Sequence, residues 1–216
     1  EALTTVANKL LADKNGIAAI TSTRLSAETL TAFKELFADK FQSRLVTSIE
    51  EGVPTAAVTK FAEKHEAFEG KLDVLRNADT VFCIGANIHR SHMVAGFLFK
   101  RNLSKGTKLI NIDPESSDLD DMSNIALKTH PGSDLALIRG LQAVIVSEGL
   151  GRSPLDLPDT GQLIEQAVSA AGVSHEELNQ TAQLLARSIS PVILFGKGIT
   201  AQRDETLVEE LYRLAV

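Results

Sequence analysis

The stretch "ADTVFCIGANIHRSH", residues 78–92, begins as an apolar strand and breaks at Gly85 into small, polar and basic residues. An apolar run that leads through a glycine into a helix is typical of the first half of a parallel β–α–β unit. The backbone N–H groups presented where such a strand meets its helix bind anions well. The sequence therefore predicts an α/β protein with a ligand site at this strand end.

Strand-like and helix-like segments alternate along the whole chain. Most of the predicted strands are almost continuously apolar, as expected where helices cover both faces of a sheet. The fold class that we predict is α/β, with two Rossmann-like lobes, mainly parallel sheets and helices on both faces. The predicted strands are residues 17–22, 44–48, 80–85, 108–113, 124–129 and 191–196.

Helix starts are marked by capping side chains. Ser26 and Thr29 open a predicted helix over 26–41, and Ser133 and Ser174 open two more, with acidic residues close behind. The chain begins and ends in helix-like sequence, so we expect it to be a piece of a larger protein.

A looser stretch, "LGRSPLDLPDTG" at 150–161, is rich in proline and glycine and is expected to link two lobes. We predict an outer α/β lobe made of residues 1–42 and 150–216, and an inserted α/β lobe made of residues 43–149. This arrangement requires the first strand, 17–22, to pair with the last, 191–196.

Composition restricts the possible functions. The chain has 216 residues, and 44% of them are hydrophobic. Its formal net charge of −6 argues against a protein that binds nucleic acid or a membrane surface, because such proteins usually carry an excess of basic residues. No apolar run reaches the ~20 residues needed to cross a bilayer, so we expect no direct membrane insertion and a cytoplasmic location. A local excess of cations follows the opening strand, at His89, Arg90, His92, Lys100, Arg101, Lys105 and Lys108.

The chain has a single cysteine, Cys83, which excludes an internal disulfide and an all-cysteine metal site within the chain. Because it lies in an apolar strand, we predict a buried small hydrophobic residue and not a nucleophile.

Three motifs follow strand ends. Gly85 ends the opening strand, and Asp113 with Pro114 ends the next, an order found in nucleotide-binding folds, where the acid bonds a ribose. The full GxGxxG fingerprint is absent, so a standard NAD site is not predicted. An acid before proline is also a common turn starter.

The second motif is "HPGSD", residues 130–134, and the third is "FGKGIT", residues 195–200. Gly132 is expected in a tight turn, with Ser133 and Asp134 at a helix N-terminus, either as an ordinary cap or with the carboxylate accepting two N–H bonds from guanine. Gly196 and Gly198 flank the end of the last strand, where they form either a ligand loop or a flexible turn.

Taken in order, these motifs resemble those of the molybdopterin-dinucleotide oxidoreductases, especially formate dehydrogenase large subunits and the related large iron–sulfur subunit of complex I. The residues that carry the resemblance are Gly85, Asn87, His92, Asp113, Pro114, Pro131, Gly132, Ser133, Asp134, Gly196, Gly198 and Thr200. The resemblance extends over nearly the whole chain.

The resemblance implies a middle portion of a protein that also carries an iron–sulfur cluster in an N-terminal domain. It implies bis-molybdopterin guanine dinucleotide, with Mo or W, in that parent protein. Residues 85–92 and Asp113 would hold a pyrophosphate and ribose, Asp134 would bond guanine, and residues 196–200 would approach the other half of the cofactor. The implied partners are other domains of the same polypeptide and electron-transfer subunits, and we expect this fragment alone to hold no cofactor and to be inactive.

Three departures from the family pattern stand out. Glu115 replaces an arginine after Asp-Pro, and Met93 replaces the proline after His92. Residues 43–58 contain neither the cysteine or selenocysteine nor the histidine of formate-oxidising members, so that Thr47 or Ser48 would have to replace the metal ligand.

Two functions therefore stay open. One is a cofactor-holding fragment of a formate dehydrogenase-like enzyme; the other is a cofactor-free scaffold within a complex I large subunit. A third, the middle domain of a thiamine-diphosphate enzyme, rests on "SPVILFGKGIT" and leaves "IDPE" and "HPGSD" without a role.

Overall fold

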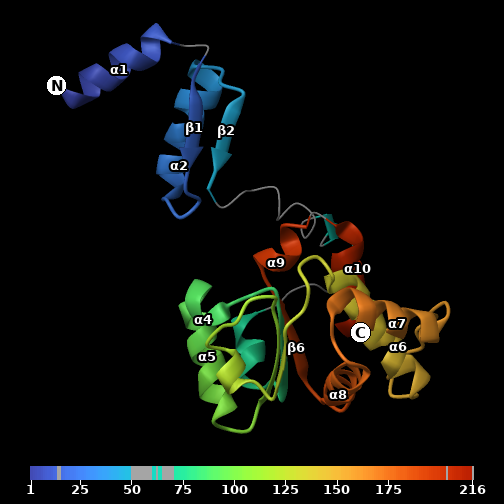
Figure 1. Ribbon diagram of the computed structural model, residues 1–216. Helices are drawn as coiled ribbons and strands as arrows, with labels where there is room; N and C mark the ends of the chain where they lie inside the picture. Colours follow the sequence, from blue (N-terminus) through green and yellow to red (C-terminus); the bar gives the residue numbers. More distant parts are fainter. Residues whose placement is uncertain (14–15, 50–59, 62, 65–70, 203, 216) are drawn as a thin grey trace. The chain divides into compact units, whose positions relative to one another are not determined.

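The computed structural model describes residues 1–13, 16–49, 60–61, 63–64, 71–202 and 204–215 (Figure 1). The chain divides into two compact units, Glu1–Val53 and Pro54–Val216.

The first unit is a two-stranded parallel sheet with helices. Ala18 pairs with Leu45 and Thr21 with Ser48, and the Ser26 hydroxyl caps its helix by accepting from the Thr29 N–H at 3.4 Å. The helix predicted over 26–41 is confirmed, although its second half is a π-helix. The elements are α1 (Ala2–Ala12), β1 (Ala18–Thr21), α2 (Ala27–Lys34), η1 (Glu35–Lys40) and β2 (Leu45–Ser48).

The second unit is built on a four-stranded sheet of order β5-β4-β3-β6, in which every pair is parallel. Thr80 in β3 lies between Lys108 of β4 and Pro191 of β6. The strands are β3 (Thr80–Ile84), β4 (Lys108–Ile112), β5 (Ile125–Leu127) and β6 (Pro191–Phe195). With β1 and β2, they confirm every strand that the sequence predicts.

The predicted pairing of the first and last strands is wrong, because β6 pairs with β3 and β1 pairs with β2. The discontinuous outer lobe depends on that pairing. A polar clamp fixes β6 beside β3: the Asp79 carboxylate accepts from the N–H groups of Ile189 and Ser190 at 2.6 and 3.1 Å. Hydrophobic patterning does not reveal a clamp of this kind.

Helices surround the four-stranded sheet. Ser174 forms the predicted cap, a capping box with Glu177, whereas Ser133 occupies the N-cap position without capping, because its hydroxyl donates to the His130 carbonyl at 2.6 Å. The helical elements are η2 (Leu72–Arg76), α4 (Ile88–Ser91), α5 (Met93–Leu103), η3 (Asp120–Met122), α6 (Asp134–Ser147), α7 (Thr160–Ala171), α8 (His175–Ala186), α9 (Lys197–Thr200) and α10 (Glu205–Ala215).

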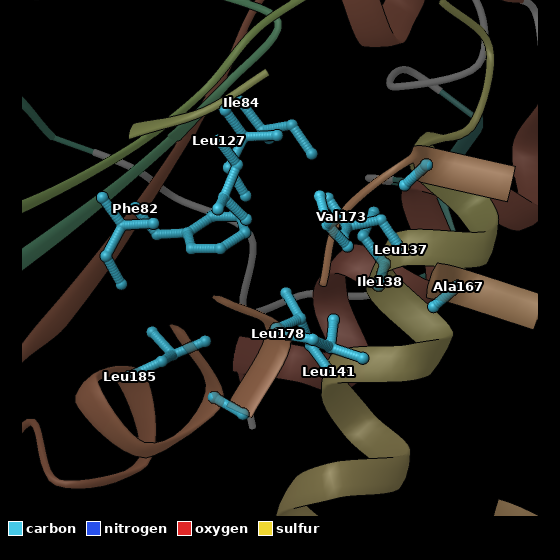
Figure 2. Close-up of a cluster of buried hydrophobic side chains, with 14 of the residues drawn as sticks. Phe82, Ile84, Leu127, Leu137, Ile138, Leu141, Ala167, Val173, Leu178 and Leu185 are labelled. Carbon is cyan, nitrogen blue, oxygen red and sulfur yellow. The ribbon is translucent and has the colours of Figure 1, made fainter. Parts of the chain in front are cut away.

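The two faces of β3 lie in two different cores. Figure 2 shows Phe82 and Ile84 on the face that meets α6, where Leu137 and Leu141 pack. The alternate residue Cys83 faces the other core, with Phe99 of α5. Helices therefore cover both faces of the sheet, as predicted. None of the helices in the described residues is long and apolar enough to cross a bilayer.

Cys83 is the buried small hydrophobic residue that the sequence predicts. It is fully buried, and its thiol donates to the Ala86 carbonyl at 3.1 Å. Burial, aided by the nearby Asp113 carboxylate, raises the pKa of the thiol to about 12. A thiol with so high a pKa is protonated at neutral pH and a poor nucleophile.

The closest helix packing is between α6 and α7, where Gly140 faces Ala167. A Cβ on Gly140 would lie only 2.2 Å from the Ala167 Cβ, so the two helices can approach only because one of the two residues lacks a side chain. Both positions are buried.

We expect Gly140→Ala to lower the free energy of unfolding by about 1–3 kcal/mol, because the added methyl group has no space. Ala167→Gly in the same chain should restore most of the loss, since the pair of methyl groups is only exchanged between helices. Urea unfolding measures both. Gly161→Ala, whose Cβ would meet its nearest atom at 3.4 Å, is the control and should cost little. A double variant no more stable than Gly140→Ala would contradict this account.

Candidate functional site

An open cleft of about 720 Å³ lies at the carboxyl ends of the parallel strands. It brings together four of the residues that the sequence predicts: Gly85, Asp113, Pro114 and Gly198. The other residues that line it are Glu115, Lys128, Thr129, His130 and Pro131. The cleft is therefore made by the ends of β3, β4 and β5 together with α9.

Two glycines shape the floor of the cleft. Gly85 has φ of +56°, and its carbonyl accepts from the Gly198 N–H at 3.0 Å. A Cβ on Gly198 would lie 2.7 Å from the Gly85 Cα, and one on Gly196 would lie 2.7 Å from the Gly85 carbonyl oxygen. The "FGKGIT" segment is thus an ordered backbone contact that runs into α9, and the flexible-turn alternative is wrong.

Asp113 lies half-buried in the cleft and also starts a turn. One of its carboxylate oxygens accepts from the Glu115 N–H at 2.9 Å, as in an Asx turn. The sequence allows either a turn role or a ligand role, and the geometry leaves the second carboxylate oxygen available for a ligand as well.

The loop after Asp113 is braced by Asp120 and Lys128, which the sequence analysis missed. Lys128 Nζ donates to the Glu115 carbonyl and to Asp120 Oδ1, both at 2.8 Å. Asn111 Nδ2 and the Ser117 N–H also donate to the Asp120 carboxylate at 2.8 Å. Burial would raise the pKa of Asp120, but the hydrogen bonds led by that from Lys128 outweigh it and hold this pKa below its ordinary value.

The loop after Gly85 is tied to the same region by Asp118. Asn87 Oδ1 accepts from the Arg90 N–H, and Asn87 Nδ2 donates to Asp118 at 3.3 Å. His89 Nδ1 lies 2.5 Å from Asp118 Oδ2, and Lys100 Nζ lies 2.7 Å from His89 Nε2. Since an ammonium group can only donate, Nε2 accepts and Nδ1 carries the proton. The hydrogen bonds from Asn87 and His89 lower the pKa of Asp118.

Asn87 and His92 do not line the cleft. Asn87 acts through its hydrogen bonds as the N-cap of α4. His92 is exposed at the start of α5, with Nδ1 2.9 Å from the Ser91 hydroxyl.

Asp134 is buried beside the cleft, with 8% of the residue exposed. Its Oδ2 accepts from Gln202 Nε2 at 2.5 Å, and the same amide donates to the Gly198 carbonyl at 2.8 Å. Burial raises the pKa of Asp134 in spite of the Gln202 bond, and the Asp113 carboxylate adds to the rise. Gln202 thus ties the start of α6 to α9, and no local sequence pattern marks it.

Thr129 carries an unsatisfied group in the wall of the cleft. The residue is 4% exposed, and its buried hydroxyl has no hydrogen-bond partner among the described residues. Its neighbour in sequence, His130, is fixed by Nδ1 at 3.1 Å from the Ala170 carbonyl. Gly132 and Ser133 form the turn that follows, outside the cleft lining.

The predicted substitutes for a metal ligand lie in the first unit. Thr47 is exposed on β2, and Ser48 ends that strand with a buried hydroxyl that has no partner within the described part of the chain. Residues 50–58 of the same predicted loop lie outside the described residues. The described residues contain no group of three or more His, Cys, Asp or Glu that could hold a metal ion.

Comparison with known proteins gives a family match over residues 1–214, to the model described as molybdopterin oxidoreductase. Formate dehydrogenase H of Escherichia coli is 33% identical over 151 aligned residues, covering 62% of this chain and 20% of that protein. A nitrate reductase of Symbiobacterium thermophilum is 36% identical over 83 aligned residues, covering 38% of this chain and 11% of that protein. The chain thus matches only about a tenth to a fifth of the length of these relatives.

Among solved structures, the acetylene hydratase of Pelobacter acetylenicus is similar in fold, with a TM-score of 0.60 and 20% identity. The similarity covers 99% of this chain and 31% of the hydratase.

The hydrogen bonds of Asp120 should stabilise the protein in a pH-dependent way. Because its folded-state pKa is lowered, Asp120 contributes stability above its unfolded-state pKa, about 3.9, and loses it as the pH falls through the lower folded value. We expect Asp120→Asn to cost about 1–3 kcal/mol at pH 7, and progressively less as the pH falls below about 3.9 toward the folded-state pKa. Urea unfolding over this pH range measures the change. Asp121→Asn, at the exposed neighbour, is the control; a loss independent of pH would refute the role of the charge.

Proposed function

Because this chain belongs to the molybdopterin oxidoreductase family, we propose that its second unit holds the nucleotide half of a molybdopterin guanine dinucleotide within a larger, formate dehydrogenase-like enzyme. The observation that carries the proposal is the glycine-floored cleft at the carboxyl ends of the parallel strands. Ligands of open α/β sheets bind at this edge.

The residues present suit a phosphorylated nucleotide. Gly85 and Gly198 line the cleft without side chains, so a pyrophosphate could lie against the backbone of the cleft floor. Their own N–H groups already donate to the Ile112 and Gly85 carbonyls. The Thr129 hydroxyl supplies a hydrogen-bond donor that the described part of the protein leaves unused. A buried polar group without a partner is costly, and a ligand oxygen would remove that cost.

The acidic residues suit the ribose and the base. Asp113 Oδ1 accepts from the Glu115 N–H, and Oδ2, which has no hydrogen bond within the described residues, could accept from a ribose hydroxyl. Asp134 would accept the N1 and N2 hydrogens of guanine with one hydrogen on each carboxylate oxygen, because the Gln202 bond uses only one of the two lone pairs of Oδ2. Asn87 would position the loop after Gly85 through its bonds to Arg90 and Asp118, whereas Gly196 would keep the backbone contact close.

The cofactor would supply redox-active molybdenum or tungsten, and we propose that the parent also has an N-terminal iron–sulfur domain and electron-transfer subunits. This chain's own task is to bind and orient the nucleotide end. A formate dehydrogenase alpha subunit of Methanococcus maripaludis is among the relatives, at 26% identity. The cofactor-free complex I scaffold gains no support from the relatives compared, and the thiamine-diphosphate interpretation gains none from the family match.

Thr129→Val tests whether the unused hydroxyl binds ligand. The change removes no hydrogen bond within the described residues, so stability should stay equal or rise slightly. The affinity for GDP, which reproduces the guanosine and pyrophosphate of the cofactor, should fall about three- to tenfold by calorimetric titration. An unchanged GDP affinity in a stably folded variant would remove Thr129 from the site.

Asp134→Asn tests the guanine contact. Asn still accepts from Gln202 and suits a helix start, so the fold should persist. The preference for GDP over ADP should fall, because one acceptor becomes a donor, at a cost on the order of 1.5–3 kcal/mol per charge-assisted bond. Titration of both nucleotides into both chains measures the change. If the unsubstituted chain binds GDP and ADP equally, Asp134 has only its structural role with Gln202.

A further inference from the structure

A separate cavity of about 200 Å³ lies at the opposite end of the sheet from the cleft, where β6 begins. It is partly open, and it is lined by α6, α8, α10, the start of β6 and the loop at 150–155. Its walls are mainly apolar, and the principal side chains are Ile145, Val146, Leu150, Leu155, Leu185 and Ile193. Nothing in the proposed nucleotide function uses this cavity.

One polar group in the wall lacks a partner. Gln142 is 1% exposed and lines the cavity, and its Oε1 is buried with no hydrogen-bond partner in the described residues. Its Nε2 donates to the Glu210 carbonyl at 2.9 Å and to Glu210 Oε2 at 3.2 Å. Because both of those oxygens accept, the amide nitrogen has to face α10, and the amide cannot turn over to satisfy Oε1.

The nearby cations are already engaged. Arg152 donates to the carbonyls of Ser188 and Ile189. Arg213 lies 3.7 Å from the buried Glu210 carboxylate, which also accepts from Arg139. The unmet requirement at Gln142 Oε1 is therefore a hydrogen-bond donor, which a carboxylate cannot supply. Arg152 and Arg213 also line the cavity.

Water alone satisfies this requirement poorly. An ordered water needs two to four polar partners, whereas the residues that line the cavity are mostly apolar. In another protein an apolar cavity of about 150 Å³ holds benzene, so this cavity has room for one ring with a small substituent.

We propose that this cavity is a binding site for a small, uncharged, mainly apolar molecule that donates one hydrogen bond to Gln142 Oε1, such as a phenol or a cyclic alcohol. The ring packs against the aliphatic wall, and the hydroxyl group satisfies the amide oxygen. Recognition is thus by shape and by one donor.

The test compares phenol, anisole and benzoate on the chain as it stands. Anisole keeps the ring and oxygen but has no donor, and benzoate adds a charge. Titrations followed by NMR of the Ile145 and Ile193 methyl groups should show phenol binding about two- to tenfold more tightly than anisole, with benzoate weakest. Equal affinities, no binding of phenol, or shifts away from these methyl groups would overturn the proposal.

Two variants separate the contribution of the Gln142 hydrogen bond to binding from the contribution of the cavity itself. Gln142→Met keeps the length but removes the acceptor, and should abolish the preference for phenol over anisole. Ala186→Leu fills the cavity from its wall while leaving the Gln142–Glu210 bonds intact, and should abolish binding of both probes. Ser169→Leu, at an exposed position of α7, is the matched control and should change neither affinity. Phenol binding that survives Ala186→Leu would place the site elsewhere and refute the proposal.

Discussion

The candidate site depends on one strand, β3, that is paired along both edges and buried on both faces. All of its residues are buried, from Thr80 to Ile84. The strand is thereby fixed in position, so the chain that leaves it at Gly85 starts from a defined point. From there the backbone contact with Gly198 sets the floor of the cleft, and Asp113 reaches it from the neighbouring strand. The floor of the cleft is therefore supported by a strand held along both edges and on both faces.

The strands could be predicted because each is a short apolar run between polar segments, and parallel strands covered on both faces require little else. The caps at Ser26 and Ser174 were equally local signals. The pairing of the strands could not be predicted in the same way. Because β1 and β6 are both apolar, hydrophobicity alone allows them to pair with each other. The choice was made by Asp79, whose carboxylate bonds the chain entering β6, and an isolated aspartate carries no such signal in sequence.

In the candidate site, too, local features could be predicted from the sequence, whereas contacts between distant residues could not. Gly85 and Asp113 follow strands directly and Gly198 lies in the short helix just after β6, so topology brings the three together. Thr129 and Gln202 were missed because their importance comes from side chains distant in sequence or from an absent partner. Asn87 and His92 illustrate the reverse case, since they belong to the recognised motif but do not line the cleft. A motif identifies a loop, and only the three-dimensional structure shows which of its side chains face the ligand.

The pairing of β3 with β6 also determines the order in which the protein can fold. Ser190 and Asp79, which bond at the start of this pair, are 111 residues apart in the chain. During synthesis β3, β4 and β5 leave the ribosome long before β6, and until then one edge of the fully buried strand β3 stays open to other chains. Contacts of such long range form slowly. The nascent second unit is therefore most prone to aggregation between the synthesis of β3 and that of β6. A chaperone would prevent the most aggregation during this interval.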